Sequence, residues 1–172
     1  RLIYSKLHFA IQKLPSKIIM VTSVTAGEGK SLATANLGIA MAEAGLNVVI
    51  VDANLRRPAQ HEIFEVANAN GLIEVLHAPR QQLDIYLKNT AVINLRVLTA
   101  GTLPMHSAGM LGSAQMSDLL HRLADEVDVV LCDSPEATGV ADAAILAHQV
   151  AGVLLVMRKE KLARSLIKEA IR

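Results

Sequence analysis

Apolar runs of four or five residues alternate along the chain with longer stretches in which apolar residues recur every three or four positions. Runs rich in Val and Ile are typical of buried strands, and the longer spacing is typical of amphipathic helices. The runs predict strands near 18–22, 48–52, 95–99, 129–133 and 153–157. The stretches with apolar residues at every third or fourth position predict helices near 1–13, 31–44, 59–66, 71–77, 114–125, 140–148 and 161–171. This alternation predicts an α/β fold with a doubly wound, mainly parallel sheet and helices on both faces.

No internal repeat, low-complexity linker or domain boundary divides the chain. Its length suits one domain with a sizeable core, so we expect residues 1–172 to form a single domain. Gly45 is expected to end the first long helix, and residues 101–112 are expected to form a long mobile loop. The chain starts without Met and stops inside a helical pattern, so we expect the domain to be part of a longer protein.

A glycine-containing segment follows the first predicted strand and opens the first long helix. In such a loop the backbone N–H groups converge on phosphate oxygens, and the helix N-terminus favours an anion. Lys30 can reach the outer phosphates and the Ser31 hydroxyl can bind Mg²⁺. The general sequence pattern of phosphate-binding loops has Gly where this chain has Val24. The predicted strand before the loop and the predicted helix after it nevertheless make a chance match to that pattern the less favoured interpretation. The residues expected to contact the nucleotide are Thr25, Ala26, Gly27, Glu28, Gly29, Lys30, Ser31 and Leu32.

Two further apolar strands end on aspartates, Asp52 and Asp133. The carboxyl ends of parallel strands meet at one edge of the sheet, where open α/β sheets bind ligands. We therefore expect both carboxylates to lie beside the glycine loop, where they can bind Mg²⁺ directly or through water, or activate a hydroxyl group. Either Asp alone can instead cap a helix or form a turn. Their shared position beside a phosphate loop favours the site.

Three motifs in this order resemble those of the cytoplasmic kinase domain of bacterial tyrosine kinases, which act in capsular and exopolysaccharide export. The loop 25–31 resembles the Walker A motif of that family. Residues 52–58, Asp-Ala-Asn-Leu-Arg-Arg-Pro, resemble its second Walker motif, which is usually Asp-x-Asp-x-Arg. Residues 129–135, Val-Val-Leu-Cys-Asp-Ser-Pro, resemble its Walker B. Weaker matches lie at residues 70–76 and 111–113, and the resemblance covers nearly the whole chain.

The resemblance implies a P-loop NTPase that uses Mg²⁺-ATP to phosphorylate tyrosine, including its own, in trans between subunits. By this resemblance Lys30 stabilises the β and γ phosphates, and Asp52 orients or deprotonates the tyrosine hydroxyl with Asn54 beside it. Ser31, Asp52 and Asp133 are the implied Mg²⁺ ligands, Asp133 through water. The implied partners are other copies of the chain and a transmembrane polysaccharide co-polymerase or activator segment, on the same or a separate chain. The implied location is the cytoplasmic face of the inner or plasma membrane.

The chain departs from the family pattern at several places. Asn54 replaces the second acidic residue of the Asp-x-Asp motif; its carbonyl oxygen can bind a cation, but it brings no charge and cannot act as a base. The N-terminal Glu-x-x-Arg assembly motif is incomplete, and the C-terminal tyrosine cluster is absent, since Tyr4 and Tyr86 are the only tyrosines. These departures keep open an alternative: a nucleotide-dependent ATPase that acts as an assembly switch of the export machinery without kinase activity.

Arg56 and its neighbour Arg57 follow Asp52 closely, and two interpretations stay open for them. They can hold phosphate oxygens or a carboxylate of a neighbouring subunit, or they can form a solvated basic turn. Arg56 is therefore a candidate catalytic residue.

The position of Thr25 distinguishes two groups of related proteins. In the partitioning ATPases a second lysine occupies this position, so Thr25 favours the bacterial tyrosine kinases.

The composition and net charge of the chain narrow the range of expected functions and partners further. The chain is 52% hydrophobic and 2% aromatic, which predicts an aliphatic core, and its net charge of +1 gives no reason to expect nucleic acid as a partner. The six histidines show no pair at metal-ligand spacing. Cys132 is the single cysteine and lies in a predicted buried strand, which suits a reducing cytoplasm. No apolar run approaches transmembrane length, so we expect any membrane span of the parent protein to lie outside this segment.

Overall fold

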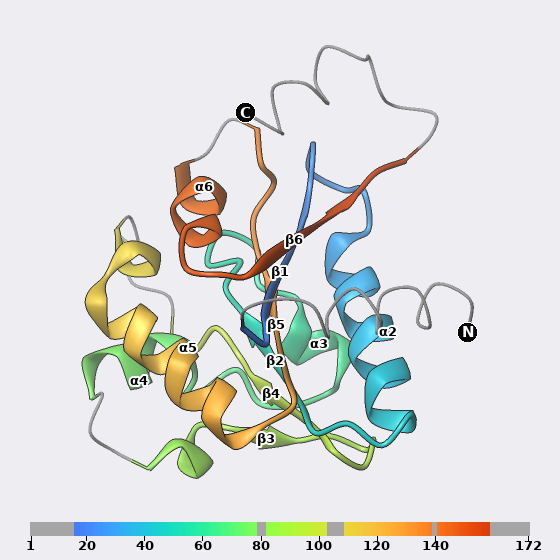
Figure 1. Cartoon of the computed structure of the whole chain (residues 1–172), viewed down its shortest axis with the longest axis vertical. Coiled ribbons are helices and arrows are strands. Elements are labelled where there is room, and N and C mark those ends of the chain that lie inside the picture. The colour runs from blue at the N-terminus through green and yellow to red at the C-terminus, as the bar shows by residue number, and fades with distance from the viewer. Residues whose placement is uncertain (1–15, 79–81, 103–108, 139–140, 159–172) are drawn as a thin grey trace.

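The computed structural model describes residues 16–78, 82–102, 109–138 and 141–158 of the chain (Figure 1). The predicted helices over residues 1–13 and 161–171 lie outside these ranges, as does the middle of the predicted loop over residues 101–112. Among the described residues, no helix is long and apolar enough to cross a bilayer.

A single six-stranded sheet forms the centre of the fold, in the order β3-β4-β2-β5-β1-β6. All pairings are parallel except that of β3 with β4, which is antiparallel. The predicted mainly parallel α/β sheet is confirmed, and the short edge strand β3 is an addition to it. The strands are β1 (Ile18–Ser23), β2 (Val48–Asp52), β3 (Lys88–Asn89), β4 (Leu95–Leu98), β5 (Val129–Asp133) and β6 (Gly152–Val156).

Five α-helices connect the described strands and cover the sheet, at the places where the apolar spacing predicts them (Figure 1). Gly45, with φ of 92°, follows the first of them and ends it as predicted. The helix predicted over residues 59–66 is shorter, because Glu65 takes a positive φ of 53°. The helices are α2 (Lys30–Glu43), α3 (Gln60–Ile63), α4 (Leu72–His77), α5 (Ala114–Glu126) and α6 (Ala141–Ala147), with 3₁₀ turns η1 (Leu83–Ile85) and η2 (Met110–Gly112).

Two aliphatic cores hold the layers together, one on each face of the sheet. Because side chains alternate along a strand, successive residues of each central strand enter opposite cores. In β2, Ile50 packs in the core beneath α2, whereas Val49 and Val51 pack in the core beneath α4, α5 and α6. The second core includes Met116, Leu119, Leu120 and Leu123 of α5, the face predicted from their spacing.

The sheet order brings the three motifs to one edge. β5 lies between β1 and β2, so the strand that precedes the glycine loop and the two strands that end on aspartates are direct neighbours. In the strand register Asp133 pairs with Val21 of β1 on one side and with Asp52 of β2 on the other. The connection from β1 through α2 leads to β2, and β5 lies between these two strands although it follows both in the sequence. Doubly wound sheets bind ligands at such a point, where the order of the strands reverses.

Candidate nucleotide site

The glycine loop connects β1 to α2 and has the backbone shape that its glycines permit. Gly27 and Gly29 take positive φ values of 77° and 87°, and no heavy atom lies within 4 Å of the position where a Cβ would stand. Gly29 is the N-cap residue of α2 and has no side chain with which to cap it. The first N–H groups of α2 therefore lack a helical partner at the point where the loop meets the helix. This is an arrangement that binds phosphate oxygens.

Glu28 stabilises the loop from inside rather than facing solvent. Its side chain is buried, and its Oε2 atom accepts a hydrogen bond from the backbone N–H of Thr25 at 2.9 Å. The Ser23 hydroxyl donates to the Thr25 carbonyl at 2.8 Å. Of the predicted nucleotide contacts, Glu28 can therefore offer its backbone, whereas the side chain of Leu32 is 57% exposed and open to solvent.

Asp52 and Asp133 form a fully buried pair of carboxyl groups at the ends of neighbouring strands. Burial, together with the negative charge of Asp133, raises the pKa of Asp52 to about 7, although three backbone N–H groups oppose the shift. Burial also raises the pKa of Asp133, against hydrogen bonds from Gln60 and Ser31 and the positive charge of Lys30. The Asp52 carboxyl is thus poised to change its protonation near neutral pH.

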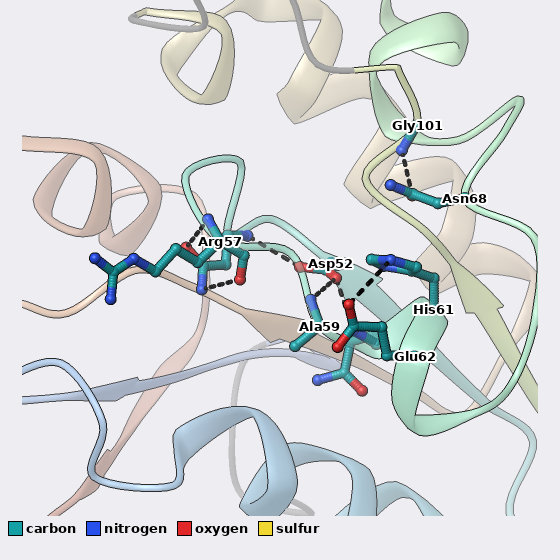
Figure 2. Close-up of polar contacts among 9 residues, drawn as sticks. Asp52, Arg57, Ala59, His61, Glu62, Asn68 and Gly101 are labelled. Atoms are coloured by element: carbon teal, nitrogen blue, oxygen red, sulfur yellow. Dashed lines mark hydrogen bonds and ion pairs between the residues drawn. The ribbon is translucent and has the colours of Figure 1, made fainter.

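Asp52 also holds the start of α3 in place (Figure 2). Its Oδ2 atom accepts the backbone N–H groups of Ala59 and Gln60, both at 2.9 Å. Its Oδ1 atom accepts one longer bond, from the N–H of Asn54 at 3.3 Å. Asp52 therefore caps a helix and ends a strand of the site at the same time, and Oδ1 is the oxygen with the weaker internal contact.

Asn54 lies beside Asp52, but its amide group is used within the turn that follows. Its Nδ2 donates to the carbonyl of Arg57 at 2.8 Å, and its Oδ1 accepts the N–H of Arg57 at 3.4 Å. The Arg56 side chain, which is half-exposed, forms an ion pair at 2.9 Å with Asp142 of α6. The second Walker segment is thus fixed locally, and Arg56 contacts a carboxylate of its own chain.

Gln60 joins all three motifs and was not among the residues predicted from the sequence. It is fully buried, and its Nε2 atom donates to Asp133 Oδ2 at 2.8 Å and to the carbonyl oxygen of Ser31 at 3.0 Å. Its backbone N–H is one of the two that Asp52 Oδ2 accepts. The only signal in the sequence is its place two residues after the segment 52–58, which does not reveal these contacts.

The residues at this edge fit a hydrated Mg²⁺ ion and a nucleotide. Asp133 Oδ1 is buried and has no hydrogen-bond partner within the described part of the chain, so it can accept bonds from cation-bound water. The same described residues contain no group of three or more His, Cys, Asp or Glu side chains that could hold a metal ion. Proteins bind Mg²⁺ through one or two carboxylates together with substrate phosphates, and Asp52 and Asp133 place two carboxyl groups at this edge.

The free energy of unfolding of the metal-free protein is expected to fall between about pH 4 and pH 7, relative to that of an Asp52→Asn variant. The Asp52 carboxyl ionises near 3.8 in the unfolded chain and near 7 in the folded protein, which therefore binds the proton more tightly. Its stabilising contribution is complete below the lower value and is lost as the pH rises through the upper one, a change of roughly 4 kcal/mol. Denaturant unfolding in EDTA at a series of pH values measures this; a pH-independent difference would contradict it.

Comparison with known protein families matches residues 15–172 to the ParA family, described as NUBPL iron-transfer P-loop NTPase. Tyrosine-protein kinase YwqD of Bacillus subtilis is 34% identical over 174 residues, which cover 99% of this chain and 73% of YwqD. Tyrosine-protein kinase Etk of Escherichia coli is 32% identical over 158 residues, which cover 92% of this chain but 22% of Etk. The match to Etk is thus to one part of a much longer protein.

Solved structures agree with the sequence matches. The kinase domain of Escherichia coli tyrosine kinase ETK superposes with a TM-score of 0.90 at 30% identity, over 97% of this chain and 65% of that one. The chimerical protein CapA2B2 superposes with a TM-score of 0.88 at 30% identity, over 98% of this chain and 74% of that one. The resemblance drawn from the three motifs is confirmed, and the chain belongs to the bacterial tyrosine kinases, within the P-loop NTPases.

Proposed function

We propose that this domain transfers the γ-phosphoryl group of Mg²⁺-ATP to tyrosine hydroxyl groups and so regulates polysaccharide polymerisation and export. The observation that carries the proposal is the buried pair Asp52 and Asp133 beside the phosphate loop. A carboxyl with a pKa of about 7 is matched to a general base that works at neutral pH. Family membership supports the choice of tyrosine as acceptor.

Each residue of the site has a role in this reaction. The N–H groups of the loop and the Lys30 ammonium bind the phosphates, and Ser31 and Asp133 hold the cation, which neutralises developing negative charge when bound. The tyrosine oxygen attacks the γ-phosphorus, the bond to the β,γ-bridging oxygen breaks, and ADP leaves. Asp52 accepts the hydroxyl proton on Oδ1, its less engaged oxygen. Since the transition state is loose, positioning and charge supply most of the catalysis.

The acceptor tyrosine is proposed to come from another chain or another segment. Tyr86 is 5% exposed and packs in the core beneath α5, so its hydroxyl cannot reach a second active site without local unfolding. Tyr4 lies outside the described residues. Transfer in trans within a homo-oligomer, at the cytoplasmic face of the membrane and beside a transmembrane activator segment, is the arrangement that we propose. The relative CapA2B2 is a chimera, which is compatible with such an activator on a separate chain.

Incubation of the purified protein with γ-labelled ATP and Mg²⁺, with and without an activator segment, tests this function. Label on tyrosine, found by peptide mapping, is the expected result. ATP hydrolysis without phosphotyrosine under any condition would instead support the assembly switch. Asn54 favours that second candidate, because its uncharged amide is engaged with Arg57.

An Asn54→Asp variant is expected to phosphorylate tyrosine faster than the wild type. The second carboxylate supplies the negative charge that Asn54 lacks beside the proposed cation and tyrosine hydroxyl. Nucleotide affinity should change much less, and the free energy of unfolding should fall by about 1 kcal/mol because the bond from Nδ2 to the Arg57 carbonyl is lost. Initial rates on an added tyrosine peptide measure the effect. An equal or lower rate would mean that Asp52 alone carries the role.

A further inference from the structure

Gln60 is the one described residue whose hydrogen bonds reach all three motifs of the site. Its side-chain amide donates to the phosphate loop at Ser31 and to the Walker B carboxyl at Asp133. Its backbone N–H donates to Asp52, at the end of β2. The residue begins α3 and is completely buried. One residue therefore links the loop to both carboxyl groups, to Asp133 through its side chain and to Asp52 through its backbone.

The orientation of the Gln60 amide follows from its partners. Ser31 offers a carbonyl oxygen and Asp133 a carboxyl oxygen, and both are acceptors, so the NH₂ group must face them. A flipped amide would place its own oxygen against two other oxygens. The Oε1 atom is thus directed away from these contacts, and within the described part of the chain it is buried without a partner.

The same contact leaves an acceptor on the other side of the carboxyl group. Asp133 Oδ2 receives the Gln60 amide at 2.8 Å, whereas Asp133 Oδ1 is buried and has no partner among the described residues. Two adjoining groups therefore each present one buried oxygen that lacks a donor. A buried acceptor without a partner is destabilising, and a bound ion or water molecule is one of the usual ways in which it is satisfied. Water molecules bound to a cation are donors of the required kind.

We infer that Gln60 is a positioning residue for the Mg²⁺-nucleotide: it holds Asp133 Oδ2 against the phosphate loop and leaves Asp133 Oδ1 to accept hydrogen bonds from the hydrated cation. The inference rests on the proposed function, because it takes the nucleotide site as given. It assigns to α3 a role that the three motifs do not include. Gln60 acts through Asp133 and Ser31 rather than on the transferred phosphoryl group.

The test compares ADP affinity with and without the cation in a Gln60→Met variant, which keeps the length of the side chain and removes both polar atoms. Calorimetry in excess Mg²⁺ and in EDTA gives the factor by which the cation tightens ADP binding. Loss of an outer partner of a metal ligand usually lowers metal affinity 10- to 100-fold, so this factor should fall by about tenfold or more. ADP affinity in EDTA should stay close to that of the wild type. A purely structural role would weaken binding equally in both conditions.

Gln149 provides a matched control, since its Nε2 also donates to a backbone carbonyl, that of Leu111 at 2.6 Å, and its Oε1 also lacks a partner among the described residues. It follows α6, and its hydrogen bonds among the described residues go to Leu111 and Leu146 rather than to the loop 25–31 or the segments 52–58 and 129–135, so Gln149→Met should leave the Mg²⁺ factor unchanged. If Gln60→Met does not fold, Gln60→Glu keeps the size but places a carboxyl group against Asp133, and the factor should again fall. An unchanged factor in the folded Gln60 variant overturns the inference alone. A wild type that does not bind ADP overturns the proposed function as well.

Discussion

An Asp52→Asn variant is expected to form phosphotyrosine at least about 10²-fold more slowly than the wild type. The tyrosine hydroxyl is protonated at neutral pH because its ordinary pKa is near 10, so transfer to it gains from a base placed to accept the proton. Asp52 has a pKa of about 7 and ends the strand beside Asp133. Asn keeps the shape and one acceptor oxygen for the N–H groups that begin α3. The substitution therefore removes the base and leaves most of the structure.

The measurement pairs a phosphotyrosine assay on the protein, with and without an added activator segment, with ATP affinity on the same samples. ATP affinity should fall much less than the rate, because phosphate binding depends mainly on the loop. Asp128→Asn is the matched control: Asp128 immediately precedes β5, at the opposite edge of the sheet, and accepts the N–H of Asn47 at 2.8 Å. This control should retain the wild-type rate. If the rate of Asp52→Asn were within a few-fold of the wild-type rate, Asp52 would not be the base.

Lys30→Ala is expected to weaken the binding of both ATP and ADP by more than tenfold. A charge-assisted contact with phosphate is worth about 1.5–3 kcal/mol, and tenfold in affinity corresponds to about 1.4 kcal/mol. The positive charge of Lys30 also opposes the rise in the pKa of Asp133, so its loss makes the carboxyl that we propose as a cation ligand harder to ionise. Both effects act in the same direction and should be visible by calorimetry.

Lys17→Ala separates this effect from a general loss of lysine packing. Lys17 lies just before β1, at the end of the strand that is opposite to the loop, and its Nζ donates to the carbonyl of Val127 at 3.1 Å. This variant should lose some stability and keep its nucleotide affinity. Equal affinities of Lys30→Ala and the wild type would contradict the assignment of the phosphate loop.

The central strands could be predicted because each is a continuous apolar run, and burial on both faces requires such a run. β3 could not, because Lys88–Asn89 are two polar residues whose only strand feature is their pairing with β4. The length predicted for the helix over residues 59–66 was also wrong, since α3 spans Gln60–Ile63. The apolar spacing continues through Phe64, but Phe64 packs in the core beneath α2 while Glu65 turns to a positive φ and stops the helix. Tertiary packing overrides the local pattern there.

The position of the site could be predicted, but the contacts within it could not. Parallel strands place their carboxyl ends at one edge, so the sequence was sufficient to bring Asp52 and Asp133 near the loop. The engagement of Asn54 with Arg57 and the contacts of Gln60 depend on the path of the chain after β2, which no spacing encodes. Asp52 also shows that a helix cap and a strand-end carboxylate of the site can be the same residue.

The alternation of β2 between two cores makes the site more sensitive to the number of residues in the strand than to their identity. Exchange of one aliphatic residue for another changes packing within a single core and leaves Asp52 level with Asp133. An inserted or deleted residue instead exchanges the two cores for the remainder of the strand and turns its terminal carboxyl to the opposite face. Among natural variants of this domain, in-frame insertions and deletions should therefore be excluded from residues 48–52 more strictly than substitutions. Nucleotide-binding assays on the two kinds of variant would reveal that difference.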